Sequence, residues 1–415
     1  MAAGKAGPRA DCSGMKRKHT GILLVLVVIV GGAGLILQKR NQSQWSESAS
    51  PESGKVLDFP VNDVAHVEIR SPKGEVHLAK KNGVWVVAEK ADYPADFQRV
   101  SGLIRQLWEL RPVQQIKVGP SQSGRLELTE PDHGANAQPA ATSRSDAGAA
   151  GTVVELKNEN DKTLAKIILG KRVMAKENGQ ETLGRFPSMP MGRYVLAPGN
   201  GGNVSLVNQR LEFDALPQSW LKHDFVKIEN PESISLTGQT GPKHWTLTRS
   251  DAKADWKLTD AKNEELNKGT GTSFTNLLSS LRFTDVLPPD AKPEEYGLDK
   301  PELLTIQTFD RFTYTLKIGK LSSDSYPLSV SVTADPAKER AVSPDEKPED
   351  KTRLDEEFKT HLKQLDEKAA SEKECEKRIY LVPKFSLDPF LKDRADLIAK
   401  PSASHTPSPT PPKKR

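Results

Sequence analysis

The sequence predicts an α+β protein with a single N-terminal transmembrane helix followed by two tandem repeats, each an antiparallel sheet with one main helix. Three observations lead to this fold class. An uncharged apolar run lies near the N-terminus, short alternating apolar and polar segments are separated by turn residues, and the same order of landmarks occurs twice. The chain has 415 residues, which is enough for two or three domains.

The transmembrane helix is predicted over residues 20–38, around the uncharged run from Gly21 to Leu37. A run of this length can cross the hydrocarbon core of a bilayer. Basic residues are more numerous before the run than after it, so the positive-inside rule places residues 1–19 in the cytoplasm. We therefore expect a single-pass protein of the bacterial inner membrane, with a polar tether at 39–57 and the bulk of the chain in the periplasm.

A cleaved signal peptide is the competing interpretation of this run. Gly32-Ala33-Gly34 supplies the small residues that a signal peptidase prefers. However, the apolar run is longer than a usual signal sequence and continues past these residues to Leu37. An uncleaved anchor is therefore favoured.

The positive charge of the chain is concentrated beside the predicted membrane segment. The net charge is +5, but residues 1–40 alone carry +6, so the remainder carries −1. No basic stripe is left to attract a phosphate backbone, which excludes a nucleic-acid partner. Cys12 and Cys375 fall on opposite sides of the predicted span and cannot pair, and two cysteines are too few for a thiolate metal site. No metal and no cofactor is expected.

The first α+β repeat is predicted over residues 58–227. Strands at 65–70 and 75–80 alternate, and Asn82-Gly83 gives a hairpin turn before a third strand with Trp85. Apolar residues at helical spacing predict a helix from Asp96 to Leu110. The segment 132–151 is small, polar and without apolar periodicity, which indicates a low-complexity insertion.

The second repeat is predicted over residues 228–398 and follows the same order. Trp256 matches Trp85 at an offset of 171, and Pro301 matches Pro131 at 170. The offset falls to 149 between Gly170 and Gly319, which the insertion in the first repeat explains. A helix over 274–283 matches the first helix. The second repeat has its own charged, mostly helical insertion at 333–378, and the Pro/Ser-rich tail at 399–415 is predicted to be disordered.

The charged insertion carries a narrow apolar stripe at helical spacing, formed by Leu354, Phe358, Leu362, Leu365 and Ala369. An apolar seam flanked by charges suits a partner helix, so Leu354, Phe358, Leu362 and Leu365 are the candidate partner contacts. The alternative is a helix that folds back on its own domain.

Several of these features together resemble a known family. They are the basic start Met15-Lys16-Arg17-Lys18 before one span, Gly83-Val84-Trp85 in a hairpin, Tyr93 to Asp96 opening the helix, and Tyr296-Gly297-Leu298 with Pro301. The chain resembles bacterial envelope proteins of domain of unknown function 4340 over most of residues 60–330. The resemblance implies a membrane-anchored α+β protein without assigned catalytic residues, often thought to accompany an ABC-type transporter of the gliding-motility class. The first repeat departs from the pattern, with Arg125 to Leu128 where Tyr-Gly-Leu is expected.

Motifs for chemistry are weak throughout the sequence. Ser250 to Lys253 fits the loose pattern S-x-x-K, and Gly269-Thr270-Gly271 lacks the rest of a dinucleotide fingerprint. His66 and His77 lie on adjacent predicted strands, where solvent-facing polar residues are common. We therefore expect no enzyme but a non-catalytic accessory or scaffold subunit of an envelope complex. The alternatives are an envelope hydrolase with a site between the two repeats, and a ligand-binding module at the same place.

Overall fold

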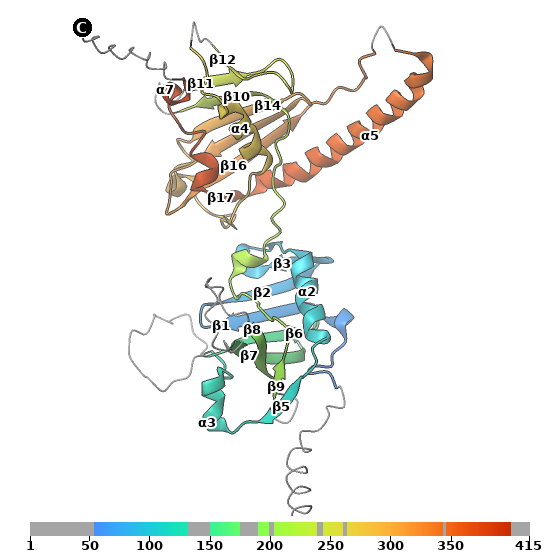
Figure 1. Cartoon of the computed structure of the whole chain (residues 1–415), viewed down its shortest axis with the longest axis vertical. Helices are drawn as coiled ribbons and strands as arrows, with labels where there is room; N and C mark the ends of the chain where they lie inside the picture. Colours follow the sequence, from blue (N-terminus) through green and yellow to red (C-terminus); the bar gives the residue numbers. More distant parts are fainter. Residues whose placement is uncertain are drawn as a thin grey trace, which may run out of the picture.

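The computed structural model describes residues 54–131, 150–174, 190–198, 203–238, 244–259, 264–342 and 346–399. They form two antiparallel sheets with few helices, one sheet in each half of the chain (Figure 1). The predicted α+β class with two sheet units is thus confirmed. Within these ranges, no helix is both long enough and apolar enough to cross a membrane. The predicted segments at 1–19, 20–38 and most of 39–57, the insertion from 132 to 149 and the tail from 400 lie outside the described residues.

The first sheet has nine strands in the order β4-β3-β2-β1-β6-β7-β8-β9-β5. Each strand pairs antiparallel with its neighbours, and the hairpins alternate apolar and polar residues so that one face is buried. The strands are β1 (His66–Ser71), β2 (Gly74–Lys81), β3 (Val84–Val87), β4 (Tyr93–Pro94), β5 (Gln114–Lys117), β6 (Thr152–Lys157), β7 (Thr163–Met174), β8 (Pro190–Leu196) and β9 (Asn203–Val207).

Helix α2 (Phe97–Trp108) packs on the buried face of this sheet (Figure 1). The Asp96 side chain caps the helix by accepting hydrogen bonds from the backbone N–H groups of Gln98 at 2.9 Å and Arg99 at 3.2 Å. The helix buries a stripe of apolar residues at helical spacing, namely Val100, Leu103, Ile104 and Leu107. The helix expected from Asp96 to Leu110 is therefore confirmed.

The second sheet has eight strands in the order β12-β11-β10-β14-β15-β16-β17-β13. Once β4 is left out, this order matches the first sheet strand for strand. The strands are β10 (Pro231–Thr237), β11 (His244–Thr248), β12 (Lys257–Leu258), β13 (Asp285–Val286), β14 (Glu302–Thr308), β15 (Phe312–Ile318), β16 (Ser325–Ala334) and β17 (Ile379–Pro383). Strand β16 reaches two residues into the segment expected to be a helical insertion.

Helix α4 (Thr270–Ser279) takes the place in the second repeat that α2 takes in the first, and starts four residues before the predicted helix. Helix α5 (Pro348–Lys373) lies within the charged insertion and extends well beyond the sheet (Figure 1). The remaining helices are short: α3 (Pro120–Ser123), α6 (Lys384–Leu387), α7 (Arg394–Leu397) and the 3₁₀ turns Val61–Asp63, Ala88–Lys90, Gly124–Leu126, Pro217–Trp220, Pro293–Tyr296 and Glu374–Lys377.

The segment that joins the two repeats is hydrogen bonded to both of them. Toward the first repeat, the carbonyl oxygen of Trp220 in this segment accepts a hydrogen bond from the backbone N–H of Asp96 at 2.8 Å. Toward the second repeat, the backbone N–H of Ile228 in this segment donates to Leu278 O at 3.3 Å. Aromatic rings from both repeats and the joining segment contact one another at this junction, namely Tyr93, Phe225, Phe283 and Tyr380. The junction is therefore packed on both sides.

Candidate functional site

The predicted stripe on α5 divides into two parts. Leu365 and Ala369 pack against the main hydrophobic core. Leu354, Phe358 and Leu362 are half-buried and belong to neither core cluster of the described residues. The C-terminal half of the helix therefore folds back on its own domain, and the N-terminal half presents apolar side chains that the core does not use.

Hydrogen bonds fix the C-terminal half of α5 to the second repeat. The buried carboxylate of Glu372 accepts a hydrogen bond from the backbone N–H of Lys227 at 2.8 Å and another from the Tyr314 hydroxyl at 2.8 Å. The Lys368 ammonium donates to Lys227 O at 2.7 Å. The C-terminal half of α5 is therefore held in one position on the second repeat. The N-terminal half, from Pro348 to about Thr360, continues the same helix and is called the free half below.

Charged residues surround the free half of α5. The Arg340 guanidinium, on the segment leading into the helix, binds the Glu346 carboxylate at 2.6 Å and Asp355 at 2.8 Å. Within the helix, Arg353 binds Asp350 at 3.1 Å and Glu357 at 2.8 Å. Such pairs contribute little stability at an exposed site, but they flank the apolar seam with charges of both signs.

A groove of about 1210 Å³ lies between the two repeats. The first repeat contributes Val84 and Phe97, which are 52% and 62% exposed, and the second contributes Glu372. Burial raises the pKa of Glu372, although the hydrogen bonds from the Lys227 N–H and the Tyr314 hydroxyl oppose the shift. The repeats therefore leave an open groove between them, lined by apolar and acidic side chains. A binding site between the repeats would require such a groove.

The histidine of this groove serves packing. The ring of His223 lies against Phe283, with 5.1 Å between the ring centroids. No hydrogen bond joins it to a serine or cysteine among the residues that the structure describes. Glu372 is occupied by two donors from the protein itself. The groove has the size for a ligand, and its described lining residues bring no nucleophile and base into hydrogen-bond contact.

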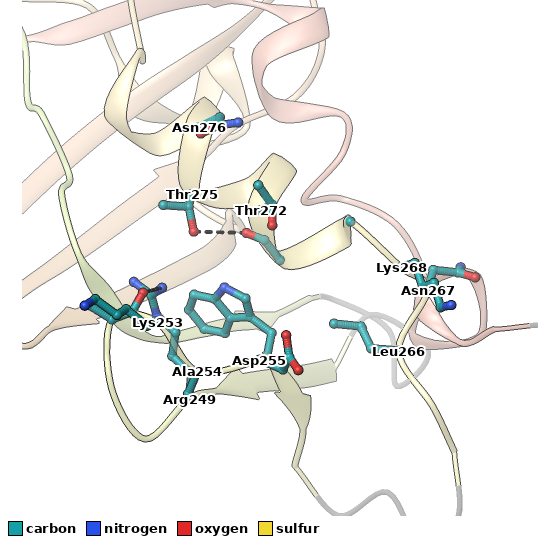
Figure 2. Close-up of a pocket in the computed structure, with 14 residues that line it drawn as sticks. Arg249, Lys253, Ala254, Asp255, Leu266, Asn267, Lys268, Thr272, Thr275 and Asn276 are labelled. Carbon is teal, nitrogen blue, oxygen red and sulfur yellow. Dashed lines mark hydrogen bonds between the residues drawn. The ribbon is translucent and has the colours of Figure 1, made fainter.

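A second pocket, of about 630 Å³, brings together two weak sequence motifs at the start of α4 (Figure 2). The Ser250 hydroxyl donates to Asp251 at 3.3 Å rather than to Lys253, so the S-x-x-K pattern forms no serine–lysine pair. Gly271 lies against the Trp256 ring, where a Cβ would overlap it. Both motifs thus have a local structural role.

The Arg249 guanidinium completes the packing of this pocket. It lies 4.8 Å from the centroid of the Trp256 ring and donates to Pro231 O and Ala252 O, both at 2.7 Å. Burial lowers its pKa. Two of the guanidinium N–H donors are therefore used to hold backbone carbonyls in place.

Sequence reasoning found the stripe on α5 and offered the place between the repeats as an alternative site, but it assigned none of the residues that line the groove to that site. The groove depends on residues from both repeats and from the joining segment, and no motif connects them. Glu372 looks like any other acidic residue of a charged helix, and only its contacts with Lys227 and Tyr314 distinguish it. Phe97 gives no signal in the sequence either, because its 62% exposure is known only from the structure.

Comparison with known proteins identifies the class of this chain. A family model described as "Domain of unknown function (DUF4340)" matches residues 85–301, which is more than half of the chain. The match begins at Trp85, in a hairpin of the first repeat, and ends at Pro301, in the second repeat. The chain belongs to this family. No curated protein and no solved structure matches it.

Proposed function

We propose that this chain is a non-catalytic subunit of a bacterial envelope complex that binds a protein partner through the free half of α5. The observation that carries the proposal is the division of the stripe. Leu365 packs on the core, whereas Leu354 and Phe358 continue the same seam beyond it. A fixed base with an unused apolar seam is expected of a helix whose second half is covered by another protein.

The place of this subunit follows from the sequence. The run from Gly21 to Leu37 anchors it in the inner membrane with the N-terminus in the cytoplasm, and the two repeats stand in the periplasm. The resemblance to the family favours an ABC-type transporter of the gliding-motility class as the complex. A tether that is short compared with the domains keeps the partner close to the membrane.

The proposal is tested by photo-crosslinking in native membranes. A photoreactive amino acid is placed at Phe358, on the seam, and in a matched variant at Thr360, on the opposite side of the same helical turn. We expect a covalent adduct with another protein from position 358 and none from 360. Equal adducts at both positions, or none from either, would contradict a specific partner on this seam.

Stability separates the two halves of the stripe. Leu365→Ala removes a side chain that packs on the core and is expected to lower the free energy of unfolding by about 2 kcal/mol. Phe358→Ala is expected to change it by less than about 0.5 kcal/mol while abolishing co-purification of the partner in mild detergent. A large loss of stability from Phe358→Ala would instead assign this side chain to the domain itself.

A ligand-binding module in the groove between the repeats is the second candidate. It is supported by the exposed Phe97 and the buried Glu372 around a groove of about 1210 Å³. Native mass spectrometry of the full chain is expected to detect a bound small molecule that is lost in Phe97→Asp and kept in Val113→Asp, an exposed apolar position outside the groove. Identical spectra for the three proteins would exclude this function.

A further inference from the structure

We propose that His77, Glu75 and Glu68 form a zinc-class divalent cation site on the outer face of the first sheet. The three residues come from two neighbouring strands. Glu68 on β1 lies directly opposite His77 on β2, and Glu75 precedes His77 by two residues. Side chains two residues apart on a strand share a face, so the register places all three together, on the side away from α2.

The distances between the donor atoms suit one small cation. All three ligand atoms lie within 4.8 Å of one another. His77 Nε2 is 3.3 Å from Glu75 Oε1 and 3.7 Å from Glu68 Oε1. Two ligands of a tetrahedral zinc ion with bonds of about 2.0–2.1 Å are about 3.3 Å apart. Imidazole nitrogen and carboxylate oxygen are both zinc donors, and three such ligands leave a fourth position for water or a further ligand.

Glu89 orients the histidine for this role. Its Oε1 atom is 2.6 Å from His77 Nδ1 and also accepts the backbone N–H of His77 at 2.8 Å. A histidine that donates Nδ1–H to a carboxylate presents the lone pair of Nε2, and such a carboxylate is the usual outer partner of a metal-bound histidine. Here Nε2 is the atom directed at Glu68 and Glu75.

The surrounding charges leave room for a cation. The ion pairs that join this cluster contain five carboxylates but three permanent cations, Arg70, Lys157 and Lys166. Before any proton on His77 is counted, two negative charges remain in excess. Glu68 is 8% exposed and is bound by Lys157 at 2.6 Å and by Arg70 at 2.7 Å.

A metal ion would displace one of these contacts. Arg70 binds the same oxygen of Glu68 that faces His77, so it is the contact that must yield. Its guanidinium already lies 3.8 Å from a Glu155 oxygen and 3.9 Å from a Glu130 oxygen. It can therefore turn to these carboxylates, while Lys157 keeps the other oxygen of Glu68.

Zinc titration by isothermal calorimetry tests the site on the full chain in detergent, purified without a histidine tag. We expect one zinc ion per chain, loss of that binding in His77→Gln and Glu75→Gln, and about tenfold weaker binding in Glu89→Gln. His66→Gln is the matched control, because His66 lies on the neighbouring strand and outside the cluster. It is expected to bind zinc like the wild type.

Two results would overturn the proposal: no zinc binding by the wild-type chain, or equal binding by the wild type and His77→Gln. Misfolding is not expected to confuse the result, because the side chains of His77 and Glu75 are 48% and 44% exposed. Circular dichroism of each variant verifies this. Zinc binding by the purified chain does not require the partner of α5. A negative zinc titration would therefore contradict the metal site without affecting the proposed function.

Discussion

The two repeats build the same turn from different residues. In the first repeat, Gly170 on β7 lies beneath the carbonyl group of Leu126, and in the second Gly319 lies beneath that of Tyr296, so that in each case a Cβ would overlap the oxygen. The residue after each carbonyl has a left-handed backbone, with φ of 57° at Glu127 and 70° at Gly297. The close approach of the glycine is common to both repeats, and the residue type at the left-handed position is not.

The repeats also differ in how they bury a carboxylate. Glu68 in the first sheet is buried, which raises its pKa, but the hydrogen bond from Lys157 and the charges of Arg70 and Lys157 outweigh this and leave the pKa lowered. Glu372 is buried against neutral donors, and its pKa is raised. The first repeat therefore neutralises its buried acid with cations, whereas the second favours a proton.

The largest expected effect tests the shared turn. Gly170→Ala and Gly319→Ala each force a methyl group into a backbone oxygen, which cannot move away without breaking the turn. Each is expected to lower the free energy of unfolding by about 3 kcal/mol, measured by urea denaturation. Gly102→Ala is the control, because it lies in α2 with open space around it and should stabilise the chain by about 0.5–1 kcal/mol. A small effect at only one of the two turn glycines would show that the repeats do not share this packing.

A medium effect tests the buried acids through pH. The folded pKa of Glu372 is raised, so its contribution to stability is complete below the unfolded value near 4.5 and is lost as the pH rises through the folded value. In Glu372→Gln the uncharged amide oxygen can accept from the Lys227 N–H, and the amide NH2 can donate to the Tyr314 hydroxyl oxygen. This variant is expected to match the wild type at pH 4 and to be more stable than the wild type at pH 7, where the buried carboxylate would carry a charge.

For Glu68 we expect its contribution to the free energy of unfolding to change with pH in the opposite direction. Its folded pKa is lowered, so its contribution is present above pH 4.5 and is lost as the pH falls through the folded value. Glu68→Gln should therefore destabilise the chain at pH 7 and have less effect at acid pH. Urea unfolding of the wild type and both variants at several pH values measures how the free energy of unfolding of each protein changes with pH. Parallel slopes for the two variants would contradict the contrast between the repeats.

Sequence patterns predicted the elements that depend on local order. The alternation of β1 and β2, the start of the helix at Asp96 and the glycines at 170 and 319 were all visible, because each follows from neighbouring residues. Strand β16 was missed, since Pro327 interrupts a pattern that otherwise alternates and a proline usually marks an edge strand. Here β16 lies inside the sheet, between β15 and β17.

The candidate sites were predicted only where one element carries them. The stripe on α5 was found because it lies on a single helix, but its division at Leu365 depends on where the helix meets the core. The grouping of Glu68 with His77 requires the register of two strands and the position of Glu89, and the separate residues give no motif. The groove requires both repeats and could not be found from either one.

The smallest expected effect concerns the left-handed residue of the turn. A left-handed backbone costs a residue with a side chain about 1 kcal/mol compared with glycine, and the first repeat bears this cost at Glu127. Glu127→Gly is therefore expected to raise the free energy of unfolding by about 1 kcal/mol. The reverse change, Gly297→Ala, should lower it by more, because a Cβ there would also lie 2.9 Å from Lys320.

Glu127→Ala separates the backbone from the charge. It removes the carboxylate but keeps the Cβ in the left-handed conformation, so the stabilisation should be absent or much smaller than in Glu127→Gly. Urea denaturation of the three proteins at neutral pH measures the difference. If alanine stabilises as much as glycine does, the carboxylate and not the backbone is the cause, and the difference between the two turns is one of charge. If glycine alone stabilises, the first repeat carries a strain that the second avoids, and the glycine of the Tyr296-Gly297-Leu298 turn is explained by its backbone conformation.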